Sequence, residues 1–104
     1  MRHLLAVMIF ALAPFAAQAA PGDPQCSADL ARADALISKV AARDRGGPVK
    51  PEALCSVLRA NLRDMTEANA IMRRCMTGHA LRENVGQMEA SMGDVQMVIS
   101  KRCR

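Results

Sequence analysis

Aromatic side chains are almost missing from this chain. The 104-residue sequence contains no tryptophan and no tyrosine, and its only two phenylalanines, Phe10 and Phe15, lie near the amino terminus. The core must therefore be built from Leu, Ile, Val, Ala and Met, and a core that small and light is marginal by itself. The lack of aromatics also removes base stacking, and a net charge of +4 is too small to indicate a nucleic-acid partner.

Groups suited to catalysis are scarce as well. Of the two histidines, only His79 lies outside the amino-terminal segment. The serines occur in no nucleophile-elbow motif, and the sequence has no C-x-x-C pair that would indicate redox chemistry. The acidic residues mostly fit solvated helix faces, with Asp23 as a helix cap. We therefore expect neither enzyme activity nor a cofactor.

A signal peptide is indicated at residues 1–19. Arg2 precedes a continuous apolar run from Leu4 to Phe15, and Ala17-Gln18-Ala19 fits an A-x-A cleavage site. The apolar run is too short to span a bilayer, which takes about 20 residues. We therefore expect a mature chain of residues 20–104 that forms one domain, has no transmembrane segment and is periplasmic or secreted.

The rest of the sequence predicts three helices. They cover approximately residues 23–44, 51–76 and 79–102. Gly46-Gly47-Pro48 separates the first two, and Thr77-Gly78 separates the last two. In the first helix the apolar positions recur at threes and fours, at Cys26, Leu30, Ala33, Ile37 and Val40. In the third they form a heptad seam, at Leu81, Val85, Met88, Met92, Val95 and Ile99. Because both connections are short, we expect an all-α, antiparallel three-helix bundle.

The four cysteines predict two disulfides, since an even number in a short exported chain forms a disulfide framework. Cys55 and Cys75 lie in one helix, roughly 30 Å apart at 1.5 Å per residue, whereas a disulfide needs Cα atoms within about 7 Å. Pairing Cys26 with Cys55 would join opposite ends of the bundle. The same objection applies to Cys75 with Cys103. The expected disulfides are therefore Cys26–Cys75 and Cys55–Cys103.

Methionine is enriched, with eight residues in the chain. In an antiparallel hairpin, Met65 should lie level with the segment between Met88 and Met92, where three thioethers could converge as soft ligands for Cu(I). A second group lies near the second break and comprises Met72, Met76 and His79. The alternative is packing, because methionine fills irregular gaps in a core without aromatics. We favour packing and expect no metal.

Two surfaces are candidates for binding. Basic residues gather at one pole of the expected bundle: Arg43, Arg45, Lys50, Lys101, Arg102 and Arg104. This pole could hold an anionic surface, although cations are also favoured at helix carboxyl ends by the macrodipole. The second surface lies opposite the heptad seam and comprises Gly86, Ala90, Gly93 and Met97. Small residues there would let a partner helix come close. The alternative is that these positions are ordinary helix surface with no packing requirement.

Together these features favour a non-enzymatic exported protein. It would bind or support a macromolecular partner, either a protein or an envelope component, through a helical surface. The alternative is a small copper-binding protein that uses methionine and histidine side chains.

Overall fold

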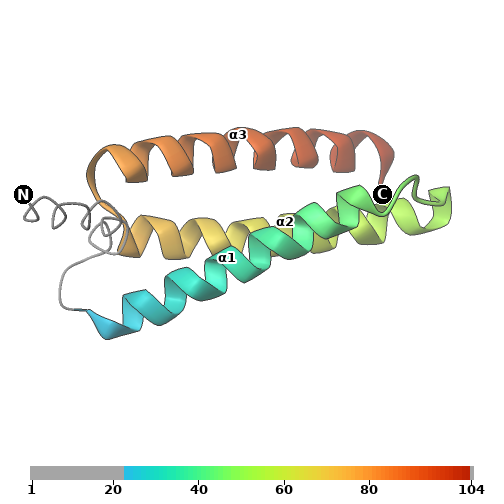
Figure 1. Ribbon diagram of the computed structural model, residues 1–104. Coiled ribbons are helices and arrows are strands. Elements are labelled where there is room, and N and C mark those ends of the chain that lie inside the picture. Colours follow the sequence, from blue (N-terminus) through green and yellow to red (C-terminus); the bar gives the residue numbers. More distant parts are fainter. Residues whose placement is uncertain (1–22, 104) are drawn as a thin grey trace, which may run out of the picture.

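The computed structural model describes residues 23–103, and this part of the chain is folded as three helices without a strand (Figure 1). The helices are α1 (Pro24–Arg45), α2 (Pro51–Cys75) and α3 (Gly78–Arg102). The all-α prediction is confirmed, and each helix end lies within one residue of its expected position. The signal peptide expected at 1–19 and the basic residue Arg104 lie outside the described residues.

Local sequence explains where the helices begin and end. The Asp23 side chain accepts hydrogen bonds from the backbone N–H groups of Gln25 and Cys26, at 2.9 and 3.3 Å, and thereby caps α1. Proline occupies the first turn of both α1 and α2, where its missing N–H costs nothing. Gly47 and Gly78 adopt positive φ angles of 94° and 66°, which glycine allows without strain. The two breaks therefore turn the chain where the sequence predicted.

The helix α2 is the centre of the fold. It packs against both α1 and α3, whereas α1 and α3 make at most marginal contact with each other (Figure 1). The α1–α2 connection and the carboxyl end of α3 lie at one end of the molecule, and the α2–α3 corner lies at the other. The bundle is therefore antiparallel as expected, but it is open along the side where α1 and α3 would meet.

The buried core is small and lies mostly between α1 and α2. Its cluster is formed by Cys26, Ala33, Leu36, Ala68, Ile71 and Cys75. Within α3, only Val85 is fully buried, and the other seam residues are partly exposed. Ile37, one of the apolar positions whose spacing predicted the first helix, is 36% exposed, whereas Leu36, which is not part of that series, is buried. Hydrophobic burial therefore stabilises the contact of α3 with α2 less than it stabilises the contact of α1 with α2.

Both disulfides form as predicted. Cys26–Cys75 joins the start of α1 to the end of α2, with Cα atoms 5.4 Å apart. Cys55–Cys103 joins the start of α2 to the residue after α3, with Cα atoms 5.8 Å apart. Each bridge closes a loop of about 50 residues, which the loop-entropy estimate equates with about 4 kcal/mol. The light core is thus supplemented at both ends of α2.

Buried polar pairs fasten α1 to α2. Arg43 Nη1 donates to Asn61 Oδ1 and to Asp64 Oδ2, each at 2.8 Å. Nearer the other end, Arg74 donates to the buried carboxylate of Asp29. The sequence-based interpretation of acidic residues as solvated was wrong for these two aspartates, because each is buried against an arginine of the neighbouring helix.

A comparable polar group fastens α3 to α2. The Glu89 carboxylate accepts hydrogen bonds from the Asn69 amide and from the Arg73 guanidinium. The hydrogen bonds from Arg73, together with that from Asn69, lower the pKa of Glu89 below its ordinary value. The ionised carboxylate therefore supports the α2–α3 contact at neutral pH.

Candidate functional site

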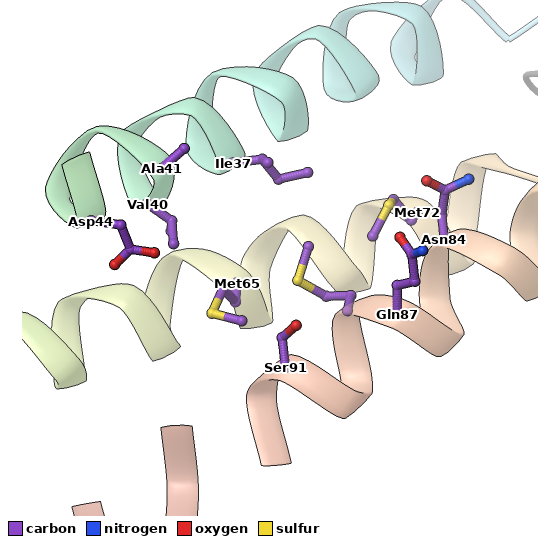
Figure 2. A pocket seen from close by; sticks show the side chains of 10 residues that line it. Ile37, Val40, Ala41, Asp44, Met65, Met72, Asn84, Gln87 and Ser91 are labelled. Carbon is purple, nitrogen blue, oxygen red and sulfur yellow. The ribbon is translucent and has the colours of Figure 1, made fainter. Parts of the chain in front are cut away.

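An open groove runs between α1 and α3, and α2 forms its floor (Figure 2). Its volume is about 340 Å³. The lining residues are Ile37, Val40, Ala41 and Asp44 from α1, Met65 and Met72 from α2, and Asn84, Gln87, Met88 and Ser91 from α3. The groove gathers side chains from all three helices around a shared space.

The position of the groove follows from the angles at which α2 binds its neighbours. At about 100° per residue, Cys55 and Cys75 lie roughly 80° to either side of Met65. Cys75 is bonded to α1 and Cys55 to the residue after α3, so the flanking helices attach to nearly opposite sides of α2. The side of α2 that carries Met65 and Met72 therefore faces the space between α1 and α3.

The two walls differ in chemistry. The α1 wall is aliphatic, with Ile37, Val40 and Ala41. Facing it, the α3 wall carries the Asn84 amide and the Ser91 hydroxyl, as Figure 2 shows. The methionines of the floor are themselves 6% and 3% exposed, so the walls cover much of their surface. The groove is thus apolar along its floor and the α1 wall, whereas the α3 wall combines the polar side chains of Asn84, Gln87 and Ser91 with Met88.

Asp44 is the charged residue of the lining, and it stands at one end of the groove (Figure 2). Its side chain is exposed. Among residues 23–103, none of the salt bridges includes Asp44. The preceding residue, Arg43, is directed to Asn61 and Asp64 of α2 instead. Asp44 is therefore the charge that the groove lining presents, while the exposed cations Arg45, Lys50, Lys101 and Arg102 lie at the same end of the molecule but outside that lining.

The predicted small-residue surface lies elsewhere on α3. Its members, Gly86, Ala90, Gly93 and Met97, are all exposed. A Cβ atom added to Gly86 or Gly93 would meet no atom within 4 Å, and Met97 is 56% exposed. This surface is therefore open on the outside of α3, and it shares no residue with the groove.

The predicted basic pole is reduced by one arginine. Arg45, Lys50, Lys101 and Arg102 are exposed at the end of the molecule that holds the Cys55–Cys103 bridge. Arg43 instead lies half-buried against α2, where its guanidinium is used by Asn61 and Asp64. The remaining exposed cations are compatible with an anionic contact and with simple compensation of two helix carboxyl ends.

The candidate metal ligands are spread over different environments. Met72 is buried in the groove floor and Met76 is partly buried, whereas the His79 side chain is 79% exposed beside Glu83. Within residues 23–103, no group of three or more His, Cys, Asp or Glu side chains is placed to hold a metal ion. The convergence predicted for Met65, Met88 and Met92 is found only in part: Met65 and Met88 line the groove together with Met72, and Met92 is not among the lining residues.

Sequence reasoning missed the groove itself, including the contribution of the α1 wall and Asp44. The available signal was the angular separation of Cys55 and Cys75 around α2, which implies flanking helices too far apart to touch. Comparison with known proteins adds no relative: no protein-family description matches the chain, and no curated protein or solved structure is significantly similar to it. Separately, no helix in residues 23–103 combines the length and apolar character needed to cross a membrane.

Proposed function

We propose that this is an exported, non-enzymatic binding protein that holds an apolar segment of a macromolecular partner in the groove between α1 and α3. The observation that carries the proposal is the open groove itself: α1 and α3 make at most marginal contact, and the space between them is lined by aliphatic side chains of α1, by Met88 of α3 and by the buried Met65 and Met72 at its floor. Methionine side chains adapt to different apolar shapes and are common on surfaces that accept partner helices.

The rigidity of the frame supports this proposal. The two disulfides lie at opposite ends of α2 and fix the helices that form the walls. A groove whose walls are held in place loses less conformational entropy when a partner binds. A volume of about 340 Å³ falls at the lower end of the range of about 300–1,000 Å³ for ligand clefts.

Export is supported by the disulfides, which persist in oxidising compartments, and by the signal-peptide pattern of residues 1–19. We expect Ala20 to be the first residue of the exported protein. Intact-mass measurement and amino-terminal sequencing of the exported product test this expectation. Recovery of residues 1–19 on the protein in a membrane fraction would contradict it.

A tryptophan-labelled peptide tests the groove directly. The chain has no tryptophan and no tyrosine, so a helical peptide with an apolar heptad stripe and one tryptophan can be followed by fluorescence with little protein background. We expect the oxidised protein to shift the peptide emission to the blue and to saturate. The substitution Ala41→Arg puts a charged side chain in the groove wall and should abolish the shift.

The matched control is Ala90→Arg, which introduces the same side chain at an exposed position of α3 outside the groove. It should bind the peptide as the wild type does. Failure of the wild-type protein to bind at any accessible concentration, or equal binding by Ala41→Arg, would contradict the proposed function. Circular dichroism of both variants establishes that they are folded.

A second candidate is Cu(I) binding, and it is favoured by one observation: Met65, Met72 and Met88 line the same groove. Soft thioether ligands suit Cu(I). Anaerobic titration of the oxidised protein tests it, with Met88→Leu expected to weaken a groove site and Met76→Leu to weaken a site near His79. If Cu(I) does not bind with sub-micromolar affinity, the copper-binding candidate is rejected and only the partner-binding proposal remains.

A further inference from the structure

The lining of the groove specifies the chemistry of what fills it. We infer that the occupant is an amphipathic helix of another protein that carries a lysine or arginine where it reaches Asp44. This inference rests on the proposed function, because it names the partner class for the same groove.

Spacing favours a helical occupant. The lining pairs Ile37 with Asp44, Met65 with Met72, and Asn84 with Ser91, one pair on each helix, and each pair spans seven residues. Seven residues are two helical turns, or about 10 Å. The groove is therefore about two helical turns long, and a partner helix places one heptad of apolar side chains, spaced by three or four residues, over that length.

Volume limits how deeply that helix enters. Two turns of a helix about 10 Å across occupy on the order of 850 Å³. The groove holds about 340 Å³, so it accepts the side chains along one stripe of a helix and leaves the rest outside. The part outside lies in water, and its near flank lies beside the α3 wall, where Asn84, Gln87 and Ser91 are polar and Met88 is apolar. An amphipathic helix fits both conditions, whereas a uniformly apolar segment does not.

Asp44 supplies the charge preference. Its carboxylate stands in the last turn of α1, where the negative end of the helix macrodipole disfavours a negative charge. It is exposed at the end of the groove, and no salt bridge within residues 23–103 includes it. A cation on the occupant would compensate this carboxylate and would also set the register of the helix along the groove.

A second copy of this chain meets the charge requirement poorly. A symmetric dimer built on this groove has its two-fold axis either along the groove or across it. The first arrangement places two Asp44 carboxylates at the same level, where like charges repel. The second places each Asp44 opposite Met72 and Asn84 of the other copy, which carry no charge. Neither arrangement brings a cation of the groove lining to Asp44, so within the groove a different protein that carries a lysine or arginine is the better match.

Three versions of one peptide test the inference. Each has about 18 residues, the same apolar heptad stripe and one tryptophan, with lysine, glutamine or glutamate at both ends so that either direction of binding brings an end to Asp44. With the oxidised wild-type protein we expect the lysine peptide to bind about 2- to 5-fold more tightly than the glutamine peptide, the range for an exposed ion pair. The glutamate peptide should bind most weakly, and the differences should shrink at high salt.

Protein variants locate the effect. Asp44→Asn should remove the preference for lysine, and Asp44→Lys should reverse the order of the three peptides. Asp34→Asn, an exposed aspartate of α1 outside the groove lining, is the matched control and should behave as the wild type does. Equal binding of the three peptides to the wild type overturns the charge preference and leaves groove binding intact, whereas binding of none overturns the proposed function too. Sedimentation showing a dimer that Ala41→Arg dissociates would assign the groove to a second copy and overturn the inference.

Discussion

Arg74 of α2 donates a hydrogen bond to the buried carboxylate of Asp29 in α1, beside the disulfide that joins the same two helices. The two contacts act on the same end of the molecule, since Cys26 is three residues before Asp29 and Cys75 directly follows Arg74. Covalent and ionic attachment therefore coincide where α1 begins.

The Asp29–Arg74 pair predicts loss of stability in acid. The hydrogen bond from Arg74 outweighs burial and lowers the pKa of Asp29 below its ordinary value of 3.8. A lowered pKa in the folded state means that the stabilisation is fully present above the unfolded-state value, and that it is lost as the pH falls through the folded-state value. We expect urea stability to be nearly constant from about pH 7 to pH 5 and to fall below about pH 4.

Two variants identify the group responsible. Asp29→Asn should lower stability at pH 7 and flatten the loss below pH 4, because the titrating carboxylate is gone. Asp34→Asn removes an exposed aspartate of the same helix and should leave the pH profile unchanged. An Asp29→Asn profile parallel to that of the wild type would assign the acid loss to other carboxylates, Glu89 first.

Arg43 should matter for stability although it lies at a half-exposed position. Replacing it by methionine leaves the buried Asp64 carboxylate and the Asn61 side-chain oxygen without their donor. Hydrogen bonds to charged groups are worth about 1.5–3 kcal/mol, so we expect a loss of that order in the free energy of unfolding. Arg45→Met is the control and should change it by less than about 0.5 kcal/mol, as surface substitutions usually do. Equal effects in urea titrations would show that the bonds to α2 contribute little.

The two disulfides should have different local consequences. Replacing Cys55 and Cys103 by serine removes about 4 kcal/mol by the loop-entropy estimate. Because α3 buries only Val85 within its own length, it should then exchange its amide hydrogens faster than α1 and α2. Replacing Cys26 and Cys75 should instead free the start of α1, whose core contacts are more extensive. Uniform loss of protection over all three helices in the first variant would contradict this separation.

Sequence predicted the helices, their order and both disulfides because these depend on local signals and on helix geometry. The apolar spacing that predicted the first helix includes Ile37 but not the buried Leu36, because it takes no account of charged side chains. Arg43 and Asp29 are bonded to α2 and lie on the same side of α1 as the buried Leu36, whereas Ile37 lines the groove. The arginine or aspartate that pairs with a buried charge lies on another helix, so the apolar periodicity of a single helix cannot predict such a pair.

The open side of the bundle was within reach of sequence reasoning. When three helices all contact one another, their axes seen end-on form a nearly equilateral triangle, because the interaxial distances are similar. Two neighbours of one helix are then separated by about 60° around its axis. The cysteines of α2 imply about 160° between α1 and α3. The same angles that fix the pairing therefore also imply a groove over Met65 and Met72. The position of Asp44 at the end of that groove depends on how α1 crosses α2, which the sequence pattern does not encode.

Glycine substitutions separate the two candidate surfaces of α3. Gly93 is exposed in the interior of the helix, and an added side chain meets no atom within 4 Å, so Gly93→Arg should fold and raise the free energy of unfolding by about 0.5–1 kcal/mol. Gly78→Ala is the contrasting variant, since its φ of 66° disfavours any other residue, and it should lower stability by about 1 kcal/mol. Because Gly93 is outside the groove, Gly93→Arg should bind the tryptophan-labelled peptide as the wild type does. If Gly93→Arg folds but no longer binds the peptide, the binding site is not the groove but the face formed by Gly86, Ala90, Gly93 and Met97.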